Sequence, residues 1–314
     1  MRKAKITVIG GGNVGATTAH RLAESQLGDV VLLDVVEGMP QGKSLDLVQA
    51  APVVHHDCQV VGANDYQPTV GSDVIVMTAG LARKPGMSRD DLRDANAKIV
   101  AECIDRAVKI SRDAVIIMVT NPLEVMCEVA RRVSGFPRER VLGMAGVLDT
   151  ARMRAFIAME MKCSADSVFA LVLGGHGDAM VPLPRYTTVS GVPITELLAK
   201  PRIDAIVRRT AQGGGEIVEL LKTGSAYYAP AAGVWEMVDS IIRDRKKILP
   251  CAVYLQGEFG LRDVFIGVPC TLGAAGMEGV FELELTAAER AALEKSAADV
   301  RSQIDKLPAG IGRP

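Results

Sequence analysis

Short, almost wholly apolar segments recur through the first half of the chain and alternate with stretches of helical periodicity. Both faces of each segment are apolar, which is typical of strands in a parallel sheet that helices cover on both sides. The alternation therefore predicts an α/β domain built on a doubly wound parallel sheet. Strands are expected at residues 5–10, 29–34, 58–63, 73–78, 114–120 and 140–145, and the clearest helices at 13–26, 90–111 and 123–134.

The pattern changes after about residue 145. Helical and β-rich segments now come in groups rather than in alternation, which indicates an α+β arrangement. The expected helices lie at 149–161, 202–222, 229–243 and 286–304, and the expected β-rich segments at 167–175, 250–259, 264–272 and 279–285. We therefore expect two domains, with the α/β domain at residues 1–145 and the α+β domain at 146–314.

Charge and composition exclude several classes of partner. The chain of 314 residues has 36 basic and 37 acidic residues, so its net charge of −1 gives no general attraction to nucleic acid or to an anionic membrane. No apolar run approaches the ~20 residues that span a bilayer, and the N-terminus has no cleavable apolar region, so we expect a cytoplasmic protein. The six cysteines are scattered without a CxxC pair, which favours buried reduced thiols over disulfides or a metal site.

A glycine-rich turn follows the first predicted strand. Residues 10–15 read GGGNVG, and they match the GxGxxG pattern between a strand and a helix. In this pattern the glycines permit a tight turn, let a pyrophosphate approach the backbone, and allow close packing of helix on strand. The free N–H groups of the helix N-terminus then face the phosphates. The cofactor-binding residues expected in this turn are Gly10, Gly12, Asn13, Val14 and Gly15.

A carboxylate ends the second predicted strand. Asp34 stands where it can hydrogen-bond an adenosine ribose, and its charge would repel a 2′-phosphate. A glycine turn with an incidental aspartate is the alternative, but strand, helix and acid together favour a dinucleotide site. NAD is therefore the predicted cofactor, in preference to NADP.

A histidine between glycines is the clearest candidate for acid–base chemistry. His176, in GGHGD, follows a predicted strand, and imidazole exchanges protons readily near neutral pH. Asp178 is the nearer carboxylate in sequence, but Asp149 is the better candidate, because it shares a helix face with Arg152 and could orient the histidine beside a substrate clamp. A turn histidine that bonds only backbone, with a helix-capping aspartate, is the alternative from the residues alone.

A cationic loop follows the strand expected at 73–78. Residues 78–92 read TAGLARKPGMSRDDL, and they place Arg83, Lys84 and Arg89 around a Pro-Gly pair. Such a loop is either a solvated surface turn or a lid that closes over an anion. The loop sequence by itself leaves both interpretations open.

Taken together, these motifs resemble the lactate/malate dehydrogenase family. GGGNVG, LLD, TAGLARKPGMSR, VTNP, LDTAR and GGHGD occur in the order found in that family, and the resemblance runs from about residue 5 to about residue 305. It implies an NAD-binding Rossmann domain, a following substrate domain, and assembly as a homodimer or homotetramer. Gly11 stands where alanine is common in the family, which is a small departure.

The resemblance also implies a role for each site residue. His176 would donate or accept the substrate proton with Asp149 as its partner, and Arg152 would hold the C1 carboxylate of the substrate by a bidentate fork. Arg89 would polarise the reacting carbonyl from the mobile loop. Asn121, in VTNP, would bind substrate and help to position the nicotinamide. The cofactor contacts added by the resemblance are Asn96, Val119 and Asn121.

The substrate is indicated by Arg83. In the resembling family, the residue six positions before the loop arginine contacts the variable end of the substrate, and it is typically Gln in lactate and Arg in malate dehydrogenases. Arg83 therefore implies a dicarboxylate, malate or oxaloacetate, and residues 223–230 (TGSAYYAP) resemble the malate dehydrogenases that are closer to lactate dehydrogenases. A lactate or other 2-hydroxyacid dehydrogenase is the near alternative, and a non-catalytic dinucleotide sensor is the distant one.

Overall fold

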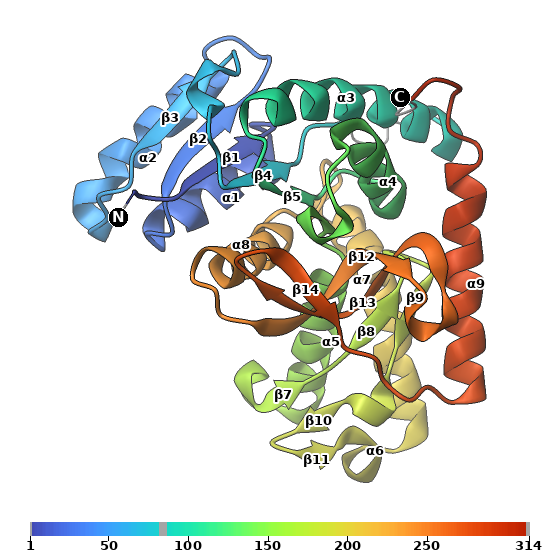
Figure 1. Cartoon of the computed structure of the whole chain (residues 1–314). Coiled ribbons are helices and arrows are strands. Elements are labelled where there is room, and N and C mark those ends of the chain that lie inside the picture. Colours follow the sequence, from blue (N-terminus) through green and yellow to red (C-terminus); the bar gives the residue numbers. More distant parts are fainter. Residues whose placement is uncertain (1, 82–86, 312–314) are drawn as a thin grey trace.

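The fold is given by a computed structural model that describes residues 2–81 and 87–311 (Figure 1). Its first half forms a parallel sheet in the order β3-β2-β1-β4-β5-β6, with Ile6 paired to Val30 on one side and to Val74 on the other. This is the strand order of a doubly wound dinucleotide fold, so that prediction is confirmed. The strands are β1 (Lys5–Ile9), β2 (Asp29–Leu33), β3 (Val60–Ala63), β4 (Val74–Met77), β5 (Val115–Met118) and β6 (Val141–Gly143).

Both faces of this sheet are buried, as the apolar runs predict. In β2, Val30 and Leu32 enter one hydrophobic cluster, whereas Val31 and Leu33 enter a second cluster on the opposite face. Helix α1 covers the first face, and α3 and α4 cover the second, because their buried side chains belong to those clusters. The helices of the first half are α1 (Asn13–Glu24), α2 (Met39–Val54), α3 (Arg89–Ile110) and α4 (Leu123–Ser134).

Helix α2 is absent from the sequence-based prediction. Its apolar residues do not form a buried stripe, because Leu45, Val48 and Val53 are 58%, 42% and 77% exposed. The positions of α2 that are buried are Pro40 and Ser44. The prediction depends on an apolar stripe at helical spacing that faces the core. A helix that turns apolar side chains away from the core of its own chain lacks that stripe.

The second half continues the large sheet with antiparallel strands. β12 pairs with β13 along most of its length, and it joins the parallel part where Ala252 lies opposite Gly143. The strands of this part are β8 (Val172–Gly174), β9 (Met180–Pro182), β12 (Lys247–Gln256), β13 (Arg262–Gly273) and β14 (Gly276–Val280). A separate small sheet contains β7 (Val168–Phe169), β10 (Thr188–Val189) and β11 (Val192–Pro193). The division into domains at residues 145 and 146 stays a prediction.

Two predicted strands differ from the structure. The strand expected at 167–175 is two short strands, β7 and β8, because the chain leaves the small sheet at Phe169 and enters the large one at Val172. The β-rich segment expected at 279–285 ends at Val280, since β14 spans Gly276–Val280 and the following residues are irregular. Both segments are rich in apolar residues, and local pattern alone does not show which sheet such a segment joins.

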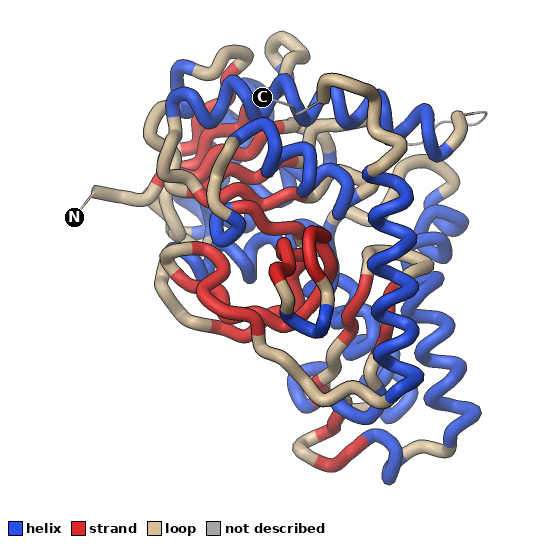
Figure 2. Tube along the Cα trace, turned by 45° about the vertical axis from the view of Figure 1, so that its right-hand side comes forward, coloured by secondary structure: helices blue, strands red, loops and turns tan. Residues whose placement is uncertain are grey.

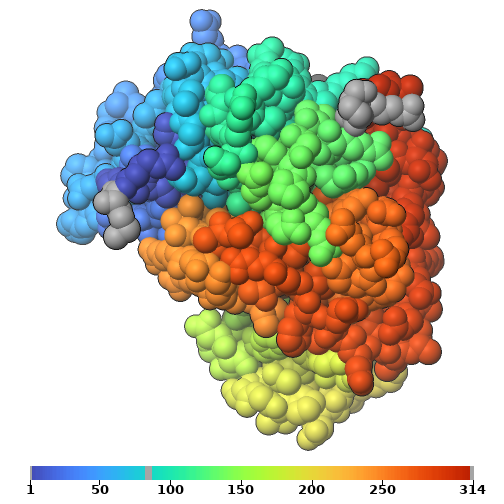
Figure 3. All heavy atoms as spheres, in the orientation of Figure 1, coloured from blue at the N-terminus to red at the C-terminus, as the bar shows by residue number. Residues whose placement is uncertain are grey.

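The remaining helices surround the second half. Helix α9 packs against α4 of the first half and against β9 and β13 of the second, so it spans both halves along one side of the molecule (Figures 2 and 3). The helices are α5 (Gly146–Met161), α6 (Ile194–Leu197), α7 (Lys200–Leu221), α8 (Tyr228–Ile242) and α9 (Ala287–Ile304). Short 3-10 turns lie at Gln67–Thr69, Arg138–Arg140, Ala165–Ser167, Pro184–Tyr186 and Glu258–Gly260.

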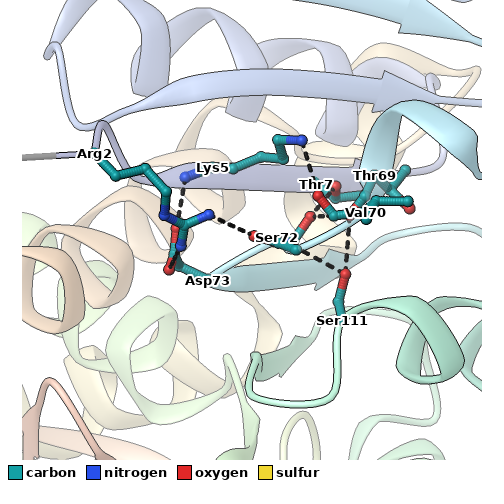
Figure 4. Close-up of polar contacts among 9 residues, drawn as sticks. Arg2, Lys5, Thr7, Thr69, Val70, Ser72, Asp73 and Ser111 are labelled. Carbon is teal, nitrogen blue, oxygen red and sulfur yellow. Dashed lines mark hydrogen bonds and ion pairs between the residues drawn. The ribbon is translucent and has the colours of Figure 1, made fainter.

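A polar network closes the amino-terminal end of the parallel sheet (Figure 4). Asp73 accepts the backbone N–H of Lys5 at 2.7 Å and is paired with Arg2, while the Ser72 hydroxyl lies 2.7 Å from that of Thr7. Ser111 donates to the carbonyl of Thr69 at 2.9 Å. These contacts fix the loops at this end of the sheet and leave the opposite, carboxyl-terminal end for ligands, as is usual in open α/β sheets.

Candidate active site

The glycine turn between β1 and α1 has two positions that the fold requires and one that it does not. Gly10 has φ +105°, and a Cβ there would lie 2.6 Å from the backbone nitrogen of Ala79. A Cβ at Gly15 would lie 1.8 Å from the carbonyl oxygen of Gly10. At Gly12 a Cβ would meet no atom within 4 Å. The open space at Gly12, next to the N-terminus of α1, fits a cradle for a pyrophosphate.

Asp34 follows β2 directly and faces this turn. Its carboxylate accepts the backbone N–H of Gly11 at 2.6 Å and that of Val36 at 2.9 Å. A Cβ at Gly11 would lie 2.9 Å from the sulfur of Met39, which is near the end of a flexible side chain that can move aside. Lys43 of α2 donates to the carbonyl of Gly11 at 2.6 Å. The turn, the aspartate and α2 thus form one unit at the end of the sheet.

Asn96 connects the loops that follow β4 and β5. It is 1% exposed, its Oδ1 accepts the N–H of Leu81 at 2.7 Å, and its Nδ2 donates to the carbonyls of Asn121 at 2.7 Å and Leu81 at 3.3 Å. The side chain therefore braces two loops at the carboxyl ends of their strands. Val119 continues β5, with its N–H donating to the carbonyl of Met77 at 2.9 Å. The assignment of Asn96, Val119 and Asn121 as direct cofactor contacts stays a prediction.

Of the two carboxylates considered as partner for His176, the structure places Asp149 against the ring. His176 Nδ1 lies 2.9 Å from Asp149 Oδ2, and the Asp149 side chain is 2% exposed. The Asp178 side chain is 85% exposed and lies 3.4 Å from Arg89. Burial by itself lowers the pKa of His176, but the charge and hydrogen bond of Asp149, together with Glu124, outweigh burial and Arg152, so this pKa is raised above its usual value.

Arg152 carries an unused donor. Its Nη1 donates to Asp149 Oδ1 at 3.1 Å, while its buried Nε has no hydrogen-bond partner among the described residues. A Cβ at Gly213 or Gly214 of α7 would come within 3.2 or 3.4 Å of this side chain, so the two glycines leave room for the guanidinium. A buried guanidinium with a free N–H is suited to an anion, and a carboxylate fits its planar geometry.

Several of the predicted site residues line one cleft. It has a volume of about 940 Å³ and is lined by Arg89, Asn121 and His176, among others. Arg89 is the first residue of α3, and its side chain is 81% exposed. Arg83, the residue expected to select the substrate, lies outside the described residues. The structure therefore brings together His176, Asp149 and Arg152 by direct contact, and it places Arg89 and Asn121 on the same cleft as His176.

Glu124 is a site residue that the sequence reasoning missed. It is 6% exposed, lines the same cleft, and accepts the backbone N–H of His176 at 2.8 Å. Burial raises the pKa of this carboxyl group, and the hydrogen bond and charge of His176 oppose the increase. The available signal was a carboxylate two residues after Pro122, at the start of a helix whose preceding loop carries Asn121.

Residues 2–81 and 87–311 contain no cluster of three His, Cys, Asp or Glu side chains that could hold a metal ion. All six cysteines are free, and Cys58, Cys127, Cys251 and Cys270 are buried. Within the same ranges, the helices are too short or too polar to cross a membrane.

Comparison with known proteins identifies the family. Residues 4–143 match the family model for the lactate/malate dehydrogenase NAD binding domain, and residues 146–310 match that for the lactate/malate dehydrogenase alpha/beta C-terminal domain. The chain belongs to the lactate/malate dehydrogenase family. The resemblance inferred from the motifs is confirmed, and NAD, the cofactor of this family, is the cofactor of the chain.

Curated and solved members of the lactate/malate dehydrogenase family match over nearly the whole chain. A malate dehydrogenase of Roseiflexus sp. (strain RS-1) is 57% identical over 307 residues, which cover 98% of this chain and 99% of that protein. The structure of malate dehydrogenase from Salinibacter ruber has a TM-score of 0.93 at 52% identity, with 96% and 97% of the two chains covered. A lactate dehydrogenase of Cryptosporidium parvum, solved with lactic acid and nicotinamide adenine dinucleotide, has a TM-score of 0.94 at 38% identity and coverage of 97% and 98%. Overall shape thus fits both branches of the family, and sequence identity is higher for these malate dehydrogenases.

Proposed function

We propose that the chain is an NAD-dependent malate dehydrogenase that interconverts (S)-malate and oxaloacetate. The curated relatives at 56–57% identity over nearly the whole chain carry this name. The observation that carries the chemistry is the contact of His176 with buried Asp149, next to Arg152 with its unused Nε. A dinucleotide sensor would have no need for this buried charged group.

The proton is assigned to His176. Because Nδ1 faces Asp149 at 2.9 Å, Nε2 is the ring nitrogen left for the substrate. In oxaloacetate reduction the imidazolium donates the Nε2 proton to the carbonyl oxygen as that oxygen becomes a hydroxyl, and in malate oxidation neutral Nε2 takes the proton back. Asp149 holds the ring orientation and stabilises the imidazolium in both directions. Bound NADH supplies the hydride that adds to C2 of oxaloacetate.

The substrate carboxylates are assigned to arginines. We assign the C1 carboxylate to Arg152, whose buried Nε has no partner in the described part of the chain and whose guanidinium can present two parallel N–H donors. Arg89 lies on the same cleft as His176 and is assigned to the carbonyl oxygen, and Arg83 is assigned to the C4 carboxylate from its place in the sequence. In a site closed to water, these charges act more strongly than they would in solution.

The deciding assay compares two substrates. NADH oxidation is followed at neutral pH with oxaloacetate and with pyruvate at equal concentrations. We expect kcat/KM for oxaloacetate to exceed that for pyruvate by at least about 100-fold, because pyruvate offers no second carboxylate to Arg83. A preference for pyruvate would assign the chain to the lactate branch, and no turnover with either substrate would refute the dehydrogenase assignment.

We also propose that the chain assembles as a homodimer or homotetramer and acts in the cytoplasm. The exposed apolar side chains Leu45, Val48 and Val53 on α2 support assembly, because a large apolar patch on a helix face is typical of an interface. Light scattering at micromolar concentration tests this directly. A mass equal to one chain of 33.3 kDa would contradict it.

A further inference from the structure

The loop that carries His176 is held by three helices. The ring contacts Asp149 of α5 at 2.9 Å, and two successive backbone N–H groups are taken by side chains of other helices. The Gly175 N–H donates to the hydroxyl of Ser296 in α9 at 2.8 Å, and the His176 N–H donates to Glu124 Oε1 in α4 at 2.8 Å. A glycine-flanked loop would otherwise be mobile. These three contacts fix both its path and the direction of the ring.

Glu124 differs from Ser296 because it brings a charge as well as an acceptor. It is 6% exposed, and the groups that approach its carboxylate are N–H donors, namely the backbone of His176 and its own backbone. It also lies in the first turn of α4, where the free N–H groups of the helix favour a negative charge. An ionised carboxylate, which only accepts hydrogen bonds, fits this environment, whereas a protonated one would need an acceptor for its O–H.

The charged groups around His176 differ in whether a partner of opposite charge lies beside them. Asp149 and Arg152 of α5 offset each other, and exposed Asp178 and Arg89 form a second pair at the mouth of the cleft. The same cleft is also lined by the ion pair of Asp90 and Arg93 in α3, and by Lys295, Asp299 and Lys306 at the C-terminal end of the chain. Among the described charged residues that line this cleft, Glu124 is the buried carboxylate without an ion-pair partner, and an imidazolium at His176 would place a positive charge beside it. A buried carboxylate near an imidazole favours the protonated ring.

We propose that Glu124 is a positioning residue for proton transfer, which holds the backbone of His176 in place and supplies the second negative charge that keeps the ring protonated for reduction. The inference rests on the proposed role of His176 as the proton donor. It adds a second buried carboxylate to Asp149, so that the ring and the backbone of the histidine are each held by a buried acid.

Three substitutions distinguish the effect of the Glu124 charge from its role in holding the His176 loop. Glu124→Gln keeps an acceptor oxygen for the His176 N–H and removes only the charge. Ser296→Ala removes the neighbouring loop contact without changing any charge. Glu128→Gln is the matched control, because Glu128 lies one turn further along α4, is equally buried at 5%, and pairs with Arg131 and Arg132 instead of His176.

The measurement is kcat/KM against pH with NADH saturating, taken with whichever 2-oxoacid the wild type reduces, so that an error in the proposed substrate does not affect it. We expect Glu124→Gln to move the alkaline limb of reduction, and the acid limb of the reverse oxidation, to lower pH by about one unit. Ser296→Ala should lower the plateau without moving either limb, and Glu128→Gln should change neither. NADH affinity should be the same in all four proteins.

The proposal is overturned if Glu124→Gln leaves both limbs in place, whether its plateau falls or not, because Glu124 would then act at most as a scaffold. Thermal unfolding shows whether each variant is folded. Should Glu124→Gln not fold, Glu124→Asp serves in its place, since it keeps the charge but draws it back by one methylene. Its limbs should stay within about half a unit of wild type while its plateau falls, and a shift of a full unit would contradict the charge argument.

Discussion

Replacing Asp149 with asparagine would remove one charge from the site at almost constant volume. Both neighbours of this carboxylate are donors, since His176 presents Nδ1 at 2.9 Å and Arg152 presents Nη1 at 3.1 Å. Asparagine has one acceptor oxygen and can serve only one of them, so its NH2 group must face the other donor. Asp149 is 2% exposed, which leaves little access for water to relieve the mismatch.

The cost can be worked out from this geometry. Although burial lowers the pKa of His176, the charge and hydrogen bond of Asp149 raise it and favour the imidazolium. The His176 side chain is 19% exposed, so most of this effect should persist. We expect Asp149→Asn to lower kcat/KM for oxaloacetate by about 100-fold or more, equivalent to ~2.7 kcal/mol.

The direction of the pH dependence follows from the raised pKa of His176. Reduction needs the protonated ring, so loss of Asp149 should move the alkaline limb of kcat/KM to lower pH. Steady-state NADH absorbance between about pH 6 and pH 9 measures this limb. Asp178→Asn is the control, because the Asp178 side chain is 85% exposed and should change kcat/KM by less than about three-fold. An Asp149→Asn enzyme within three-fold of wild type, with an unmoved limb, would refute the reasoning.

Three further predictions address other parts of the site. His176→Asn should abolish turnover while NADH still quenches protein fluorescence with nearly unchanged affinity, and substantial residual kcat at neutral pH would remove His176 from proton transfer. Asp34→Ala should reduce the preference for NAD over NADP, measured as the ratio of their kcat/KM values, because it removes both the ribose acceptor and the repulsion of a 2′-phosphate; an unchanged ratio would count against that role. Arg83→Gln should lower kcat/KM for oxaloacetate by a few hundred-fold, about 3–5 kcal/mol, and raise activity on pyruvate, since it leaves a carboxylate unpaired in a closed site. If the oxaloacetate-to-pyruvate preference does not change, Arg83 does not select the substrate.

The sequence predicts the parallel sheet and the glycine turn well, because both have local signals. Apolar runs such as that of β2 report burial on two faces, and the turn at residues 10–15 is set by neighbours in the chain. Helix α2 and the break between β7 and β8 are missed because neither has such a local signal. Helix α2 exposes its apolar side chains. The break depends on which sheet β7 and β8 each join, and that is a property of the whole fold.

The contacts of His176 were also harder to predict where the partner lies far away in the sequence. The residues alone favoured Asp149 over Asp178 as the partner of His176, and they did so only through the helix face that Asp149 shares with Arg152. Distance along the chain would have misled, since the nearer carboxylate in sequence is not the nearer one in space. Glu124 was missed because its contact with His176 crosses 52 positions and uses the backbone of the histidine. Motifs carry the identity of side chains, but a main-chain N–H leaves no trace in a sequence.

In a screen of all single substitutions, Gly10 and Gly15 of the β1–α1 turn would behave differently from Gly12. Alanine at Gly10 or Gly15 would collide with the backbone, so such variants would be lost from any screen that scores folded protein. Alanine at Gly12 meets nothing within 4 Å, and its φ of −63° is ordinary for any residue, so this variant should fold and be lost only when growth or turnover is scored. A screen for abundance alone would therefore classify Gly12, the position assigned to the pyrophosphate, as tolerant.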